Sequence, residues 1–413
     1  MYKQLLINKK IRYYLLGGGV SKLGDVLTGM AFLFITYDVT GSSLHTTGMA
    51  IAETLPYLFF GLIGGVTADW LPRRKLLILL DLLRTPLLLM IVCLYYLDML
   101  NYMILLIINF LMQSAGCFFN PAHRTVLASI TTEAERVTAN SANDTLSRGV
   151  TVLSPVISVW LLNTFGAIHF FTIDAITFLI SAYCILKIDL IDKKNVAPRH
   201  KKIKAALFAI FEFVHWVRKQ VTIKKLFLFT FITVFFNTWV WEVGMLLALS
   251  KMSSASEQLY SILQGLFGGI VIVTNIIIPY FIKKMTLRHY FIGSIIWATG
   301  ITYYGLLYDI PHFFIGAAIV GIGMPLASLT RVYIVQSLVP EDKMGRAFSF
   351  NAVLLYFSNT ISLALYGIFS LHVSIQFLMC VSGIFMLLVS LIGLLSSIYF
   401  TKFGRRFPIH FHK

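Results

Sequence analysis

Charged residues are scarce in this sequence, because Asp, Glu, Lys and Arg make up 13% of its 413 residues whereas hydrophobic residues make up 58%. Soluble domains carry about 25% charged residues, so this composition excludes an ordinary soluble protein. Apolar runs of roughly 20 residues, the length that crosses a bilayer as a helix, recur from one end of the chain to the other. The sequence therefore predicts an all-α integral membrane protein.

The sequence is also poor in residues for metal, redox or nucleotide chemistry. Its four cysteines all lie inside apolar runs at no paired spacing: Cys93, Cys117, Cys184 and Cys380. This pattern predicts neither disulfides nor metal ligands. In the tail, His410 and His412 lack a third ligand for a metal site. There is no glycine-rich phosphate-binding loop and no soluble nucleotide-binding domain, so we expect no enzyme activity, no cofactor and no metal.

The net charge of +16 is explained by where the bases lie along the chain. Lys and Arg occupy alternate links between the apolar runs, such as 73–75 and 331–346, and Lys251 is the single exception in the other links. This pattern follows the positive-inside rule, which places both termini in the cytoplasm. We expect the membrane to be the inner (plasma) membrane of the cell. We therefore expect membrane lipids, and no nucleic acid, as partners of these bases.

Twelve apolar runs are long enough to span the membrane. They cover residues 11–37, 46–66, 75–97, 102–122, 142–164, 166–187, 225–248, 257–281, 288–308, 311–335, 347–370 and 372–400. The even number agrees with two termini on the same side of the membrane.

The longest link divides these spans six and six. We expect a six-helix half in residues 1–188, a cytoplasmic linker in 189–224 and a second six-helix half in 225–413. Similar links follow the fourth and tenth spans, and each contains an acid followed by a base, at Glu135 and Asp342 respectively. This internal repeat predicts two pseudo-symmetric halves, an arrangement that many secondary transporters use.

The second part of the linker has the pattern of an amphipathic helix. Its apolar residues recur at helical spacing: Leu207, Ile210, Phe211, Val214 and Val217. Glu212, His215 and Lys219 occupy the other face. We interpret this segment as a helix that lies on the inner leaflet and joins the halves, and the alternative is a charged regulatory linker without membrane contact.

The loop between the second and third spans carries a distinctive motif. Gly65 is followed by Asp69, and Arg73 and Arg74 come shortly after. The sequence resembles the major facilitator superfamily in this loop, in Ser21 to Asp25, and in Asp81 with Arg84. Together these motifs resemble the twelve-span drug:proton antiporters, the group that contains macrolide efflux proteins and a siderophore exporter.

The resemblance implies that this loop braces the cytoplasmic side of the protein. Its members would be Gly65, Asp69, Arg73, Arg74, Asp81 and Arg84. In physical terms, Asp69 is placed to cap the N-terminus of another helix or to pair with a base, and Gly65 lets a neighbouring backbone approach. The alternative is that the loop only determines topology.

Acidic residues inside the predicted spans are the candidates for proton coupling or for contact with a cationic substrate. A charge at mid-membrane costs about 2.5 to 3.5 kcal/mol, so it needs a partner, water or a function. Asp25, Glu53 and Glu242 form this pool, with Glu53 slightly favoured and Asp174 as a weaker candidate. The alternative for each residue is a purely structural hydrogen bond inside the bundle.

Aromatic and amide side chains are candidates for a substrate cavity. Asn237, Trp239, Trp241 and Tyr356 suit a bulky amphipathic substrate through stacking and apolar contact. Because Trp239 and Trp241 lie two apart on a helix, we expect at most one of them to line the cavity. Packing against lipid or a neighbouring helix is the alternative.

The sequence thus predicts a monomeric secondary transporter of the major facilitator fold. The resemblance implies proton-coupled efflux of hydrophobic or amphipathic small molecules, such as macrolide-like drugs, by alternating access. A dedicated exporter of a siderophore, peptide antibiotic or other secondary metabolite is the second interpretation. A lipid scramblase or a channel is a more remote one.

Overall fold

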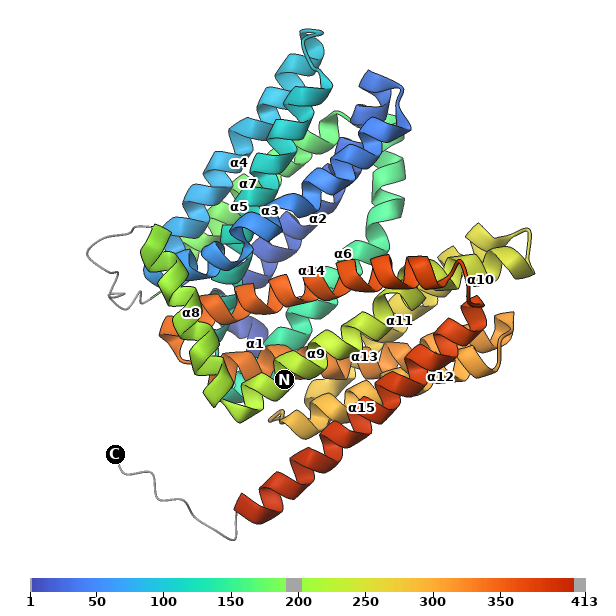
Figure 1. The fold of residues 1–413 in the computed structure, drawn as a ribbon. Helices are drawn as coiled ribbons and strands as arrows, with labels where there is room; N and C mark the ends of the chain where they lie inside the picture. The colour runs from blue at the N-terminus through green and yellow to red at the C-terminus, as the bar shows by residue number, and fades with distance from the viewer. Residues whose placement is uncertain (1, 191–202, 405–413) are drawn as a thin grey trace. The chain divides into compact units, whose positions relative to one another are not determined.

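The computed structural model describes residues 2–190 and 203–404, which form helices without a strand (Figure 1). The α-helices are α1 (Tyr2–Ile7), α2 (Lys9–Thr40), α3 (Ser43–Trp70), α4 (Arg73–Tyr96), α5 (Tyr102–Ile130), α6 (Glu133–Phe165), α7 (His169–Lys187), α8 (Ile203–Lys219), α9 (Val221–Trp239), α10 (Met245–Met252), α11 (Ser256–Phe281), α12 (Leu287–Leu306), α13 (Ile310–Leu338), α14 (Met344–Phe369) and α15 (Ile375–Gly404). A π-helix, η1 (Val240–Gly244), joins α9 to α10, and a 3-10 helix, η2 (Glu341–Lys343), precedes α14. The rejected metal site at His410 and His412 lies outside the described residues.

The helices match the predicted membrane spans. By length and composition, eleven stretches in the described residues are able to cross a membrane, with α9, η1 and α10 counted as one stretch. The predicted span at 288–308 corresponds to α12, which is not among the eleven. Its first turn contains Arg288 and His289, which lower the hydropathy of this 20-residue helix. Together with α12, the helices account for all twelve predicted spans.

Side chains at the helix starts explain several boundaries. Asn101 accepts a hydrogen bond from the backbone N–H of Ile104 at 3.0 Å, which fixes the first turn of α5. Thr132 and Glu135 form a capping box at the start of α6. Pro56 and Pro86 lie inside α3 and α4, positions that neighbouring helices make tolerable in membrane proteins.

The chain forms two compact units. The first contains Met1–Trp216 and Leu338–Val353, and the second contains Val217–Ser337 and Leu354–Lys413. The start of α14 therefore belongs to the first unit, and the same helix continues in the second. The domain boundaries expected from the sequence, at residues 188 and 225, stay predictions.

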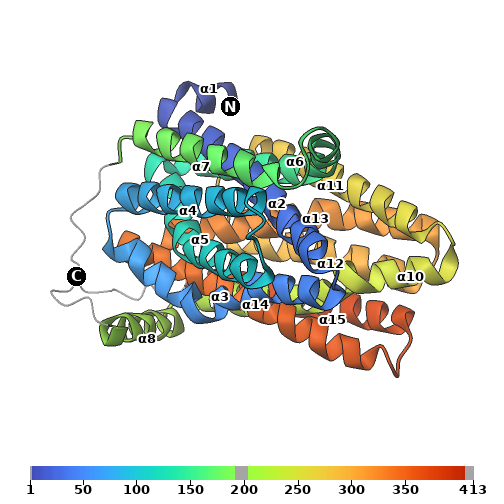
Figure 2. The same cartoon turned by 90° about the horizontal axis from the view of Figure 1, so that it is seen from above.

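The core of the first unit is built around α7. This helix lies beside α2 and α4 (Figures 1 and 2). Its buried Phe171 meets Phe32 of α2 edge to face, with ring centroids 4.9 Å apart. Phe170 and Phe178 of α7 are also buried in this core. Close aromatic packing of this kind holds membrane helices together where the hydrophobic effect between helices is absent.

The second unit contains the π-helix and a buried tryptophan next to it. Trp239 is 2% exposed and stacks on Tyr366 of α14, with centroids 5.6 Å apart. Its backbone N–H donates to Ser362 Oγ at 3.2 Å. In the same unit α12 lies beside α15 (Figure 1). The π-helix is thus anchored at its N-terminal end by α14.

The linker contains a helix, α8, where the sequence predicts one. Ala206 and Ala209 of α8 pack against Val66 and Trp70 in the last turns of α3. The buried side of α8 therefore matches the predicted apolar face only in part, since Val217 is buried and Ile210 packs beside the two alanines. Apolar residues of the predicted face, including Leu207 and Phe211, are exposed instead. The predicted position of this helix on the inner leaflet stays a prediction.

Candidate functional site

Asp69, in the last turn of α3, is buried against the start of α14. Its Oδ1 accepts from the backbone N–H of Gly345 at 2.6 Å, and its Oδ2 accepts from the backbone N–H of Arg346 at 3.1 Å. Arg346 Nε also donates to Oδ2, at 3.0 Å. Asp69 therefore makes both contacts that its place in the loop suggests, a helix cap and an ion pair.

Two glycines allow α3 and α14 to approach at this point. A Cβ added to Gly65 would lie 2.6 Å from the carbonyl oxygen of Gly345 and 2.6 Å from Ser349 Cβ. A Cβ added to Gly345 would lie 2.6 Å from Asp69 Oδ1. The backbones are thus too close for any side chain at either position, which is how small residues act in membrane helix packing.

The linker helix joins the same set of charges. Glu212 of α8 accepts from Lys343 Nζ at 2.6 Å through Oε1 and from Arg346 Nη1 at 3.4 Å through Oε2. Arg346 Nη1 also donates to the carbonyl oxygen of Ala209 at 3.1 Å. We refer to Asp69, Glu212, Lys343 and Arg346 as the gate cluster.

The arginines of the loop extend these contacts. Arg73 Nη2 donates to the carbonyl oxygen of Glu341, in η2, at 3.0 Å. Arg74 instead donates to the carbonyl oxygen of Leu186 at the end of α7. The loop therefore contacts both the segment that leads into α14 and the end of its own six-helix half.

We expect the contribution of Glu212 to stability to be lost only in acid. The hydrogen bond from Lys343, supported by the charges of Lys343 and Arg346, lowers the pKa of Glu212 below its usual value of about 4.3. A carboxyl with a lowered folded-state pKa stabilises the protein above its unfolded pKa, and this stabilisation is lost as the pH falls through the folded pKa. The Tm of wild type should therefore exceed that of Glu212→Gln by a constant amount well above the unfolded pKa of about 4.3, and the difference should shrink as the pH falls below that value and through the lower folded pKa. A Tm difference that is unchanged in acid would contradict this assignment.

A second group of charges lies inside the first unit, within the spans α2, α4 and α7. Asp81 and Asp174 are fully buried, Arg84 is 4% exposed, and Asp25 is exposed at the edge of the group. Asp25 lies within electrostatic range of both Asp81 and Asp174, and Arg84 lies within range of all three acids. We refer to these four residues as the carboxylate cluster, in which three acids share one guanidinium.

The carboxylate cluster depends on close contact between α2 and α7. Asp174 Oδ1 accepts from Thr177 Oγ1 at 2.8 Å. A Cβ added to Gly24 of α2 would overlap both of these oxygens. Gly24 therefore gives Asp174 access to the neighbourhood of Asp25.

Arg84 is held between two aromatic rings. Its guanidinium carbon lies 4.9 Å from the ring centroid of Phe119 and 5.3 Å from that of Phe178. Such cation–π contacts stabilise a guanidinium away from water. From the sequence Asp81 and Arg84 were grouped with the cytoplasmic loop, and the structure places both next to Asp25, with Asp174 close by.

Replacing Gly24 by valine should separate α2 from α7 at the carboxylate cluster. The added side chain would need the space that Asp174 and Thr177 occupy, and overpacking of a core typically costs about 1 to 3 kcal/mol. We expect a lower Tm for Gly24→Val in detergent. Gly29 of the same helix has open space at its Cβ position, so Gly29→Val is the matched control and should leave the Tm nearly unchanged.

Glu53 lies outside the carboxylate cluster but is linked to it through a base. Glu53 of α3 is exposed, and Lys22 of α2 lies within electrostatic range of both Glu53 and Asp25. Glu53 has no base near it in the sequence, and the fold supplies one. The structure thus brings three of the four acidic candidates, Asp25, Asp174 and Glu53, into one half of the protein.

The remaining candidates lie in the second unit. Glu242 is exposed and belongs to the π-helix η1. Asn237 Oδ1 accepts from Trp297 Nε1 at 3.0 Å. Trp241 packs on Phe267, with centroids 4.4 Å apart, whereas Trp239 is buried next to Tyr366. The two tryptophans therefore point in different directions, as their spacing predicts.

Tyr356 of α14 is half-buried in the same unit. It is the fourth of the cavity candidates, after Asn237, Trp239 and Trp241. Of the four, Trp239 has the least exposed surface with which to meet a substrate.

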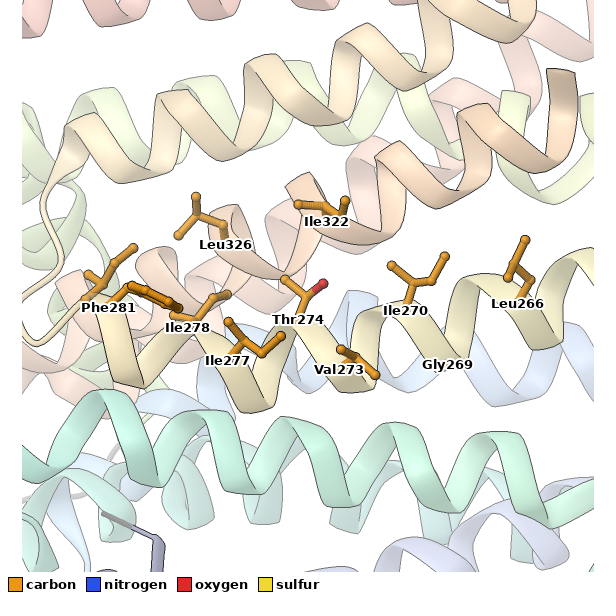
Figure 3. Close-up of a pocket in the computed structure, with 11 residues that line it drawn as sticks. Leu266, Gly269, Ile270, Val273, Thr274, Ile277, Ile278, Phe281, Ile322 and Leu326 are labelled. Carbon is orange, nitrogen blue, oxygen red and sulfur yellow. The ribbon is translucent and has the colours of Figure 1, made fainter.

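An apolar groove of about 630 Å³ follows α11 (Figure 3). It is lined by Leu266, Gly269, Ile270, Val273, Thr274, Ile277, Ile278, Phe281, Ile282, Ile322 and Leu326. Thr274 supplies the single polar side chain of the lining, and Ile322 and Leu326 come from α13. None of the four residues predicted to line a cavity contributes to this groove.

Sequence reasoning missed three residues of the gate cluster, Glu212, Lys343 and Arg346, as functional candidates, whereas it named all four residues of the carboxylate cluster. Arg346 and Lys343 lie in the link after the tenth span, where the internal repeat points to a counterpart of the first-half loops. That repeat was the available signal for them. The contact of Glu212 with these bases had no signal in the sequence, because it depends on how α8 packs on α3.

Comparison with known proteins identifies relatives over nearly the whole chain. The chain is 25% identical to an uncharacterized MFS-type transporter, YfiS of Bacillus subtilis, with 96% of this chain and 95% of that protein covered. It is 22% identical to macrolide efflux protein A of Streptococcus pyogenes, covering 93% and 96%. It is also 27% identical to a putative bacilysin exporter, BacE of B. subtilis, over an alignment that covers 50% of this chain and 51% of that protein.

Solved structures show the same fold. The fucose:proton symporter FucP of E. coli superimposes with a TM-score of 0.71 at 12% identity, covering 94% of this chain and 99% of that one. The predicted major facilitator fold is thereby confirmed. The transmembrane secretion effector family matches residues 6–405. The chain therefore belongs to the transmembrane secretion effector family of the major facilitator superfamily, and it is a multi-span membrane transporter and not an enzyme.

Proposed function

We propose that the protein exports hydrophobic or amphipathic small molecules from the cytoplasm of a bacterium and that inward proton flow drives the export. The observation that carries this proposal is the carboxylate cluster, in which three acids share one arginine inside a membrane half. Neighbouring acids, two of them buried here, do not all ionise at the same time, so such a group readily takes up and releases protons.

The positions of the acids suggest a route for the proton. Asp25 is exposed, whereas Asp174 behind it is fully buried. In our proposal a proton or a cationic substrate reaches Asp25 first, and the charge balance around Arg84 changes with it. In our proposal Glu53 and Glu242, which are exposed, are the further acids available to exchange a proton.

The gate cluster provides the conformational part of the proposal. Asp69 and Arg346 hold the start of α14 on the end of α3. Alternating access requires that contacts on one side of the membrane form in one state and break in the other. We propose that the gate cluster is intact when the cytoplasmic side is closed.

Similarity to macrolide efflux protein A suggests the first substrate to test. A radiolabelled macrolide is added to inside-out vesicles from efflux-deficient bacteria that express the chain, and a pH gradient, acid inside, is imposed. We expect uptake that collapses when a protonophore is added. Uptake that is equal in vesicles without the protein would exclude macrolides, and uptake that survives the protonophore would exclude proton coupling.

Export of one dedicated metabolite is the second candidate. The partial similarity to a putative bacilysin exporter favours it, because bacilysin is named as the cargo of that relative. The same vesicle assay with a labelled small peptide antibiotic in place of the macrolide separates the two. Transport of the peptide without transport of the macrolide would support the dedicated exporter.

A further inference from the structure

The linker helix α8 has an exposed face that the gate cluster does not use. Phe208 is 72% exposed, Phe211 is 70% exposed and Leu207 is 47% exposed. These three residues lie within one and a half turns on one side of the helix. Large aromatic side chains that stay exposed in this way mark an interaction surface.

Bases accompany these aromatic residues. Lys204 lies one turn before Phe208. His215 lies one turn after Phe211, and Arg218 and Lys219 lie two turns after it. All four of these side chains are exposed. The single acid of α8 is Glu212, and Lys343 and Arg346 bind it. The exposed face is therefore aromatic and cationic, with its one acid already paired.

The opposite face fixes the height of α8 relative to the membrane. Ala206 and Ala209 pack on Val66 and Trp70, at the end of the span α3. Arg346 Nη1 binds the carbonyl oxygen of Ala209. A helix packed on the end of a span lies at the level of the lipid headgroups, where exposed phenylalanines meet acyl chains and bases meet phosphates.

We propose that Leu207, Phe208 and Phe211 insert into an anionic leaflet. Lys204, Arg218 and Lys219 then lie at the lipid phosphates. This contact holds Glu212 in the gate cluster. The charge of the face selects anionic over zwitterionic lipid. The side of the membrane follows the positive-inside orientation predicted from the sequence. The inference does not depend on the proposed export, since it concerns lipid and the gate cluster alone.

The direct test measures the depth of the exposed face. A variant of the full chain without its four native cysteines receives Phe208→Cys, is labelled with bimane and is placed in nanodiscs with or without phosphatidylglycerol. Quenching by nitroxide-labelled lipid should rise at least about fivefold with phosphatidylglycerol and fall back in high salt. The same label on Ile210→Cys, which lies about 200° around α8 from Phe208 and packs toward α3, should respond little.

Charge variants test the role of the bases. The triple variant Lys204→Gln, Arg218→Gln, Lys219→Gln should lose the response to phosphatidylglycerol. Removing three exposed bases near the N-terminus, Lys3, Lys9 and Arg12, is the matched control and should leave the response intact. Equal quenching in both kinds of nanodisc would overturn the proposal. Free access of a water-soluble quencher to the label would also overturn it, and would indicate that this face binds a soluble partner.

The link to the gate cluster has its own readout. Hydrogen exchange of residues 341–353 should slow about threefold or more in nanodiscs with phosphatidylglycerol, because lipid-bound α8 keeps Glu212 on Lys343 and Arg346. Glu212→Gln should keep the quenching response and lose the slower exchange. If the hydrogen-exchange rate of residues 341–353 in wild type is the same with and without phosphatidylglycerol, the connection between α8 and the gate cluster is refuted.

Discussion

Replacing Asp174 by asparagine should abolish proton-driven accumulation while leaving downhill movement of substrate intact. Asparagine keeps the size of the side chain and an acceptor for Thr177 Oγ1, but it does not titrate. One pH unit is worth about 1.36 kcal/mol per proton, so coupling to one proton sustains about a tenfold substrate gradient per pH unit. The Asp174→Asn protein should sustain none, and its inside-to-outside ratio should settle near one.

The measurement compares two assays on the same proteoliposomes. Accumulation under an imposed pH gradient reports coupling, and counterflow of labelled substrate without a gradient reports the transport cycle itself. Asp144→Asn is the control, because Asp144 lies in α6 and pairs locally with Arg148 at 3.7 Å. A gradient of wild-type size in Asp174→Asn would remove Asp174 from the proton path and leave Asp25, Glu53 and Glu242.

Replacing Asp69 by asparagine should slow turnover and leave substrate affinity nearly unchanged. Asp69 accepts three hydrogen bonds, one of them from the Arg346 guanidinium, and the amide group of asparagine turns one acceptor into a donor. Hydrogen bonds to charged groups contribute about 1.5 to 3 kcal/mol each, so the equilibrium of the gate should shift by about 10- to 100-fold. Turnover should fall by a comparable factor when gate closure limits the rate.

Initial rates of counterflow and equilibrium binding of the same substrate separate these two effects. Asp342→Asn is the matched control, since Asp342 belongs to the same segment and its side chain is 70% exposed. We expect its turnover to stay within about twofold of wild type, as for an exposed ion pair. If Asp69→Asn turned over at the wild-type rate, the gate role of the cluster would be wrong.

The fold was predictable because span length and base placement leave few choices. Runs of about 20 apolar residues in a chain with so little charge indicate membrane-spanning helices, and the orientation that the bases between them indicate stays a prediction. The glycine, acid and bases of the loop after the second span also identified Asp69 as a capping or pairing residue. Its partners Gly345 and Arg346 then followed only from the fold.

The candidate site was less predictable because it depends on contacts between distant segments. Asp174 ranked below Glu53 on the sequence, because an acid at this place is common in the resembling family, and neither Asp25 nor Arg84 is near it along the chain to indicate the cluster. The absence of a side chain at Gly24 is what brings α2 up to Asp174. Asp81 was likewise grouped with the loop, although its neighbour Asp25 in the cluster lies on another helix.

The π-helix at Val240–Gly244 has a consequence for the whole seventh span. A π turn contains one residue more than an α turn, so the side chains that follow it are rotated by about 100° from the phase of α9. The side chains of α10, which follows Glu242, therefore point in directions that differ from those a continuous α-helix through α9 would give them. If this segment were a regular α-helix with every residue kept, Met245, Ala248 and Leu249 would turn by about 100° out of the interior where they are now buried. Deletion of one residue from the π turn would keep them in place. The extra residue thus changes the direction of the buried face along the span, so that the buried face of α9 and the buried face of α10 point to different neighbours.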